Sequence, residues 1–111
     1  MVNQNLAVKF EQETNSLPPE LSAVLTILNA DNELKTKALP FVNVDKKEID
    51  WNSIFKNAFG SGHRAAIVWA KCLWTDSAPA KVDAFERAFS MSPSLRAAVA
   101  RALTIRWGLG Q

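Results

Sequence analysis

The sequence predicts an all-α fold, a compact bundle of about five helices in a single domain of residues 1–111. Apolar residues recur at three- and four-residue spacing along most of the chain, and proline or capping residues precede several of these stretches. Hydrophobic residues make up 48% and charged residues 22%, the composition of an ordinary globular protein. A chain of this length buries roughly two-thirds of its surface on folding, so we expect it to fold alone.

The N-terminal segment has two interpretations. Its apolar residues alternate over residues 6–10 as in a strand, but Val2, Leu6 and Phe10 also recur at helical spacing. Good helix formers surround them, which favours a helix. The alternative is a minor β pairing between residues 6–10 and 41–44.

Two helix starts are marked by proline. Pro19 can occupy the first position of a helix that ends near residues 29–32. Ser92 and Pro93 open the last helix, which stops at Gly108. The apolar stripe of the first helix is Leu21, Val24, Leu25 and Leu28, and that of the last is Leu95, Ala98, Val99, Ala102 and Leu103.

Between these helices the sequence predicts a short helical turn at residues 33–39 and an extended stretch at residues 41–44. Asp45 or Asp50 then caps a helix that Gly60 closes. One broad face of that helix carries Trp51, Ile54, Phe55, Ala58 and Phe59.

The segment 61–74 is apolar nearly all round and is therefore predicted to be the central helix. A further helix follows, in which Val82, Phe85 and Phe89 form an apolar stripe and Asp83 is placed to meet Arg87 one turn later.

Catalytic, metal and cofactor signatures are missing from the sequence. His63 and Cys72 are the only histidine and cysteine, and nine residues of helix separate them by roughly 13 Å, too far for a nucleophile and base. We therefore expect a protein without enzymatic activity, metal or cofactor. The neighbours of Cys72 indicate a buried apolar residue and not a reactive thiol.

The sequence also predicts a cytoplasmic protein. A single cysteine cannot form an internal disulfide, which favours a reducing compartment. Residues 1–5 lack the features of a signal peptide, and no run approaches the roughly 20 apolar residues of a membrane span.

The sharpest local motif is the run of residues 60–64. Small residues and a helix start expose backbone N–H groups, and two donor side chains follow, so a small anionic ligand could bind there. The candidate residues are Ser61, Gly62, His63 and Arg64. The motif lacks the spacing and lysine of a P-loop, and a simple turn between two helices is the favoured interpretation.

Charge is distributed unevenly along the chain. Residues 56–111 hold eight bases and three acids, although the whole chain carries only +2. This asymmetry supports a nucleic-acid-binding regulator that uses Arg87, Arg96, Arg101 and Arg106. However, the last three are five residues apart, which spreads them around one helix.

Four tryptophans and six phenylalanines are a large ring complement for a small core. Rings left outside the core would form an interface. Trp107 and Trp51 are the candidates for exposure, whereas Trp69 and Trp74 are expected in the core. The principal functional prediction is a protein-interaction or assembly module that acts through an apolar surface with a protein partner or a second copy; nucleic-acid binding is the alternative.

Overall fold

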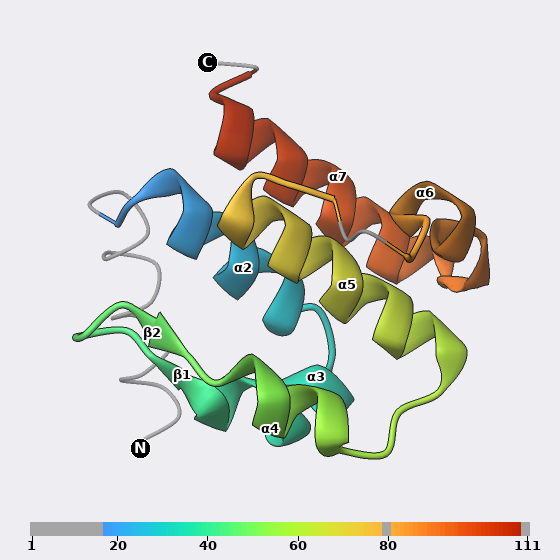
Figure 1. Cartoon of the computed structure of the whole chain (residues 1–111). Helices are drawn as coiled ribbons and strands as arrows, with labels where there is room; N and C mark the ends of the chain where they lie inside the picture. The colour runs from blue at the N-terminus through green and yellow to red at the C-terminus, as the bar shows by residue number, and fades with distance from the viewer. Residues whose placement is uncertain (1–16, 79–80, 110–111) are drawn as a thin grey trace.

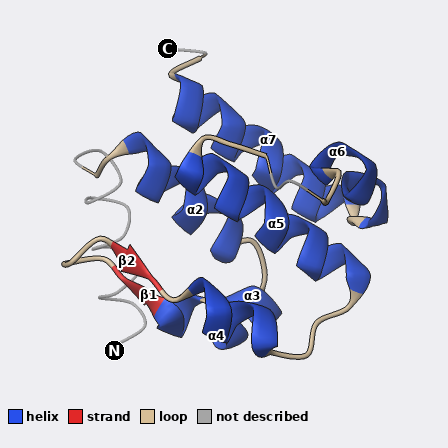
Figure 2. Cartoon of the chain, viewed as in Figure 1, coloured by secondary structure: helices blue, strands red, loops and turns tan. Residues whose placement is uncertain are grey.

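The computed structural model describes residues 17–78 and 81–109, and this part of the chain is mostly helical (Figures 1 and 2). The α-helices are α2 (Pro19–Leu28), α3 (Asn32–Lys37), α4 (Trp51–Lys56), α5 (Ser61–Thr75), α6 (Ala84–Arg87) and α7 (Pro93–Trp107). Two 3-10 helices, η1 (Leu39–Phe41) and η2 (Ala88–Ser90), and two strands, β1 (Val42–Asn43) and β2 (Glu48–Ile49), complete the described part. The predicted helical bundle with a minor β pairing is confirmed.

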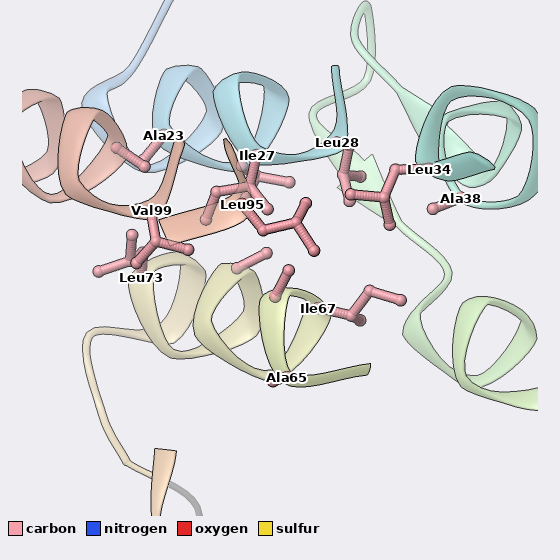
Figure 3. Close-up of a cluster of buried hydrophobic side chains, with 14 of the residues drawn as sticks. Ala23, Ile27, Leu28, Leu34, Ala38, Ala65, Ile67, Leu73, Leu95 and Val99 are labelled. Atoms are coloured by element: carbon pink, nitrogen blue, oxygen red, sulfur yellow. The ribbon is translucent and has the colours of Figure 1, made fainter. Parts of the chain in front are cut away.

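Helices α2, α5 and α7 pack against one another and enclose the core (Figure 1). Figure 3 shows aliphatic side chains from all three converging, with Leu34 and Ala38 closing one end. Helix α2 is enclosed most completely, since all five residues from Leu21 to Leu25 are buried. The predicted central helix α5 is buried along one side only, because Val68, Trp69, Cys72 and Trp74 are half-buried.

Small residues allow the close packing of α7. Ala98 and Ala102 are fully buried, and Leu95 and Val99 extend the same stripe, as the spacing predicts. Ser92 caps the helix by accepting a hydrogen bond from the Leu95 N–H at 3.3 Å. Gly108 ends it in the left-handed conformation, with φ of 67°.

The end of α4 differs from the prediction. The helix stops at Lys56, and Gly60 precedes α5 as its N-cap residue. The cause lies at Asn57, whose backbone is extended and whose side-chain amide donates to the Lys37 carbonyl at 3.0 Å. Of the two predicted capping residues for α4, Asp50 fills the role by accepting from the Ser53 N–H.

The short sheet is a hairpin. Val42 pairs with Ile49 and Asn43 with Glu48 in antiparallel register, so part of the predicted extended stretch 41–44 is a strand. Its observed partner is β2, whereas the predicted partner, residues 6–10, lies outside the described residues. In Figure 1 the hairpin, α3 and α4 lie together on one side of the three core helices, and α6 lies beside the first turns of α7. No helix in the described ranges is long and apolar enough to cross a membrane.

Candidate functional site

Among residues 17–78 and 81–109, the most exposed aromatic side chains lie on α6 and η2. Phe85 and Phe89 are each 67% exposed, although the sequence predicts them to face inward with Val82. Ala84 is half-buried, Ala88 packs against the core cluster, and Met91, which follows η2, is part of the core. The segment therefore packs on its alanine face and turns its phenylalanines outward, which corrects the predicted stripe.

The backbone at the end of η2 approaches the backbone of α5 closely. A Cβ atom added to Gly62 on α5 would lie 2.8 Å from the Ser90 carbonyl oxygen at the end of η2. A separation below 3 Å is too short for van der Waals contact, so only glycine fits there. The start of α5 and the end of η2 are therefore in close contact, and the indole of Trp69 lies against the backbone of α6 at Ala84.

The two exposed rings contact each other. Their centroids are 5.4 Å apart and their planes are inclined by 84°, an edge-to-face arrangement. The Arg96 guanidinium lies 5.9 Å from the centre of the Phe89 ring, within the range of a cation–π contact. The surface formed by Phe85, Phe89 and Arg96 is called the aromatic surface below.

Several hydrogen bonds fix the backbone beneath these rings. Arg96 donates from Nε to the Ala88 carbonyl at 3.2 Å and from Nη2 to the Phe89 carbonyl at 3.0 Å. Trp69 on α5 donates from its indole Nε1 to the Ala84 carbonyl at 2.7 Å. Asp83 accepts a hydrogen bond from the Glu86 N–H and thereby caps α6, so its carboxylate serves the backbone where the sequence predicts a pairing with Arg87. The rings are thus presented from an anchored segment.

Charges of both signs surround the aromatic surface. Arg87 and Arg96 are exposed on or beside it, and so are Asp83 and Glu86. The Arg87 guanidinium has no hydrogen-bond or ion-pair partner within residues 17–78 and 81–109, and the same is true of the Glu86 carboxylate. A partner with the same mixture of charges can therefore complement this surface.

Trp107 forms a second, smaller exposed patch with Leu109. The two side chains are 59% and 53% exposed, so the predicted exposure of Trp107 is confirmed. The fifteen residues of α7 place Trp107 roughly 21 Å from the start of that helix, far from the aromatic surface. Trp51, the other predicted interface residue, is half-buried and packs against the core with Phe55, at a centroid distance of 6.4 Å.

The remaining two tryptophans lie where the sequence predicts. Trp69 and Trp74 are half-buried and pack against the core cluster.

The four candidate arginines do not act as one group. Arg106 donates from Nε to the Leu73 carbonyl at 2.7 Å and so satisfies the C-terminal end of α5. Arg96 is bound to two carbonyls as described above. Only Arg87 and Arg101 are both exposed and without a polar partner among the described residues. The basic half of the sequence therefore supplies structural contacts as much as surface charge.

The polar side chains of the Gly60–Arg64 junction are also engaged within the fold. His63 Nε2 lies 2.6 Å from Asp31 Oδ2, and its Nδ1 lies 3.8 Å from Glu33 Oε1. Arg64 donates to the Phe55 carbonyl and to the Asn57 carbonyl, both at 3.1 Å. The motif thus ties α5 to α3 and to the end of α4, which matches the turn interpretation of the sequence.

Asp31 is the electrostatic centre of this junction. Partial burial raises the pKa of its carboxyl, but hydrogen bonds from the Leu34 N–H and from His63 outweigh burial, and the pKa falls below the usual 3.8. The ring of Phe59 stacks on His63 with a centroid distance of 6.3 Å. A charged Asp31 therefore both caps α3 and holds His63.

Cys72 is half-buried on α5, in contrast to the predicted full burial. Burial raises the pKa of its thiol, which disfavours the reactive thiolate at neutral pH. In the described ranges no group of three or more His, Cys, Asp and Glu side chains is arranged to hold a metal ion. Comparison with known protein families, with curated proteins and with solved structures finds no match.

Proposed function

We propose that this protein is a non-enzymatic helical module that associates with a second copy of itself through the aromatic surface. The observation that carries the proposal is the pair of phenylalanine rings, each two-thirds exposed and held edge to face on an anchored segment. Exposed rings of this size are a favourable core for an interface, because their burial removes apolar area from water without fixing long flexible side chains.

The charges around the rings support a second copy as the partner. Arg87 and Glu86 are neighbours in sequence, and both are exposed. In a two-fold dimer the same patch meets itself, so an arginine of one copy can face a glutamate of the other. A nucleic acid would be repelled by Asp83 and Glu86, which makes nucleic-acid binding the less favoured function.

The size of the surface predicts a weak complex. Two phenylalanine rings offer less area than the about 800 Å² that each partner contributes to a standard interface. Flanking side chains such as Arg87 and Arg96 must add to the buried area, and the dimer is expected to dissociate in the micromolar range. This is the range of a reversible assembly contact.

Sedimentation velocity over a range of micromolar concentrations tests the proposal. The protein is expected to pass from monomer to dimer as concentration rises, and Phe85→Ser with Phe89→Ser is expected to weaken the dimer at least tenfold. Trp107→Ser with Leu109→Ser is the matched control, because it removes a similar apolar patch from the other end of α7. A protein that stays monomeric, or a dimer that only the control variant weakens, would overturn the proposal.

A further inference from the structure

A groove of about 290 Å³ opens beside α5. Its apolar lining includes Val68 and Cys72 of α5, Phe55 of α4, and Val82. Its volume is close to the lower end of the about 300–1,000 Å³ range of small-molecule sites. The groove is thus of a size that admits a small apolar molecule.

The polar groups at its rim differ in their availability. Thr75 donates its hydroxyl to the Lys71 carbonyl at 3.0 Å and lies 3.0 Å from the Ser77 hydroxyl, so these two residues satisfy each other. The ammonium of Lys71 lies over the face of the Phe55 ring, with Nζ 5.8 Å from the centroid. Its ammonium has no carboxylate partner in the described part of the chain.

The apolar lining of the groove, with the Lys71 ammonium beside it and without a carboxylate partner in the described residues, favours an amphipathic anion as ligand. A hydrocarbon tail would cover Val68 and Val82, and a carboxylate would reach the Lys71 ammonium. We infer that this groove binds a small monocarboxylate with an unbranched or aromatic apolar tail.

This site is distinct from the anion site that the sequence predicts at Gly60–Arg64. The donors there are engaged by Asp31 and by backbone carbonyls, whereas Lys71 lies two turns further along α5 with its charge free. The inference does not rest on the aromatic surface, so either proposal can fail without the other.

Cys72 offers a direct reporter of occupancy, because it lines the groove and is the only cysteine in the chain. The experiment follows its alkylation by iodoacetamide, by intact mass, with and without octanoate below the concentration at which octanoate forms micelles. Octanoate is expected to slow alkylation at least fivefold at saturation. The quantity compared between proteins is the ratio of the alkylation rate with octanoate to the rate without it. This ratio cancels any effect that a substitution has on the reactivity of the thiol itself.

Two ligand comparisons separate the tail from the charge. The concentration for half-protection is expected to fall about fourfold for each methylene added between hexanoate and octanoate. Octanol, which lacks the charge, is expected to protect about threefold less well than octanoate, because an exposed charge pair contributes modestly. Equal protection by octanol would overturn the assignment of an anion.

Variants then locate the binding. Lys71→Gln is expected to reduce protection by octanoate to the level of octanol and to leave octanol unchanged, and Lys71→Arg is expected to restore octanoate binding. Val68→Phe fills the groove and is expected to remove protection by both ligands, with its fold checked by circular dichroism. If Val68→Phe does not fold, the Lys71 variants still test whether octanoate binds at this groove. Absence of protection by octanoate in the unaltered protein would overturn the inference.

Discussion

Two regions of this protein have roles opposite to those that their residue types suggest. The Gly60–Arg64 junction combines glycines, a histidine and an arginine, which is typical of a ligand site, yet Asp31 and backbone carbonyls engage its donors. The α6–η2 segment has an apolar pattern typical of a core helix, yet its phenylalanines are exposed. The polar motif is engaged within the fold, and the apolar motif forms the aromatic surface.

The physical difference between the regions is the space available to each. At the junction a loop, the start of α5 and the cap of α3 meet, so polar side chains find partners at short range. At α6 and η2 the contact with the rest of the fold involves Gly62 close to the Ser90 carbonyl oxygen, Ala88 against the core and the Trp69 indole on the Ala84 carbonyl, while the phenylalanines remain exposed. Substitutions at the junction should therefore change stability, and substitutions of the exposed rings should change association.

The largest effect is expected at the glycine that joins the two regions. Gly62→Ala places a Cβ 2.8 Å from the Ser90 carbonyl oxygen, so α5 and η2 must separate. We expect the free energy of unfolding to fall by about 2–3 kcal/mol, measured by urea denaturation. Gly60→Ala is the control, since no atom lies within 4 Å of its Cβ, and it should change stability by about 0.5 kcal/mol or less because loss of a glycine cap and reduced chain entropy offset each other. Equal effects would show that the close approach is unimportant.

A smaller effect is expected from the arginine of the junction. Arg64→Met keeps the apolar stem but removes the hydrogen bonds to the Phe55 and Asn57 carbonyls. The expected loss is about 1–2 kcal/mol in the free energy of unfolding. Arg101→Met is the matched control, because Arg101 is exposed and has no polar partner in the described ranges. A loss no greater than that of the control would mean that Arg64 is free to bind a ligand.

The exposed rings should contribute less to stability than the junction does. Phe85→Ser and Phe89→Ser each remove a side chain of which about one-third is buried, so we expect a loss of about 1 kcal/mol or less in thermal or urea unfolding of the monomer. A loss of 3 kcal/mol or more for either variant, typical of a core phenylalanine, would contradict the assignment of these rings to a surface.

The smallest effect concerns the charge of Asp31. Asp31→Asn keeps a capping side chain on α3 but removes the attraction to His63. Because the Asp31 side chain is 38% exposed, solvent screens this attraction, and the expected loss is about 0.5 kcal/mol at pH 5–6.

The pH dependence of that loss has a definite sign. The pKa of Asp31 is lowered in the folded state, so its charge stabilises the fold above the unfolded value of 3.8. The difference in free energy of unfolding between the unaltered protein and Asp31→Asn should therefore shrink as pH falls below 3.8 and through the lower folded pKa. An advantage that persists below pH 2 would show that the charge is not its source.

Most of the helical architecture follows from local sequence signals. Pro19, Ser92 and Gly108 act at helix ends through backbone geometry, which neighbouring residues determine. The premature end of α4 was not predictable in this way, because it depends on the contact of Asn57 with Lys37, twenty residues earlier.

The orientation of α6 was missed for the same reason. Both Val82–Phe85–Phe89 and Ala84–Ala88 form stripes at helical spacing, and hydrophobicity favours the larger residues. The observed orientation involves contacts with α5 that are distant in sequence, namely Gly62 with Ser90 and Trp69 with Ala84. The alanine pair was the one signal in the sequence that could have suggested a close helix contact.

Amide NMR spectra recorded over a concentration series test the division between the two regions most directly, because they observe both in one sample. With increasing concentration, the signals of residues 84–90 are expected to shift and broaden as the aromatic surfaces pair, while those of residues 60–61 and 63–64 stay constant. Concentration-dependent shifts centred on the Gly60–Arg64 junction, or no shifts at all, would contradict this account.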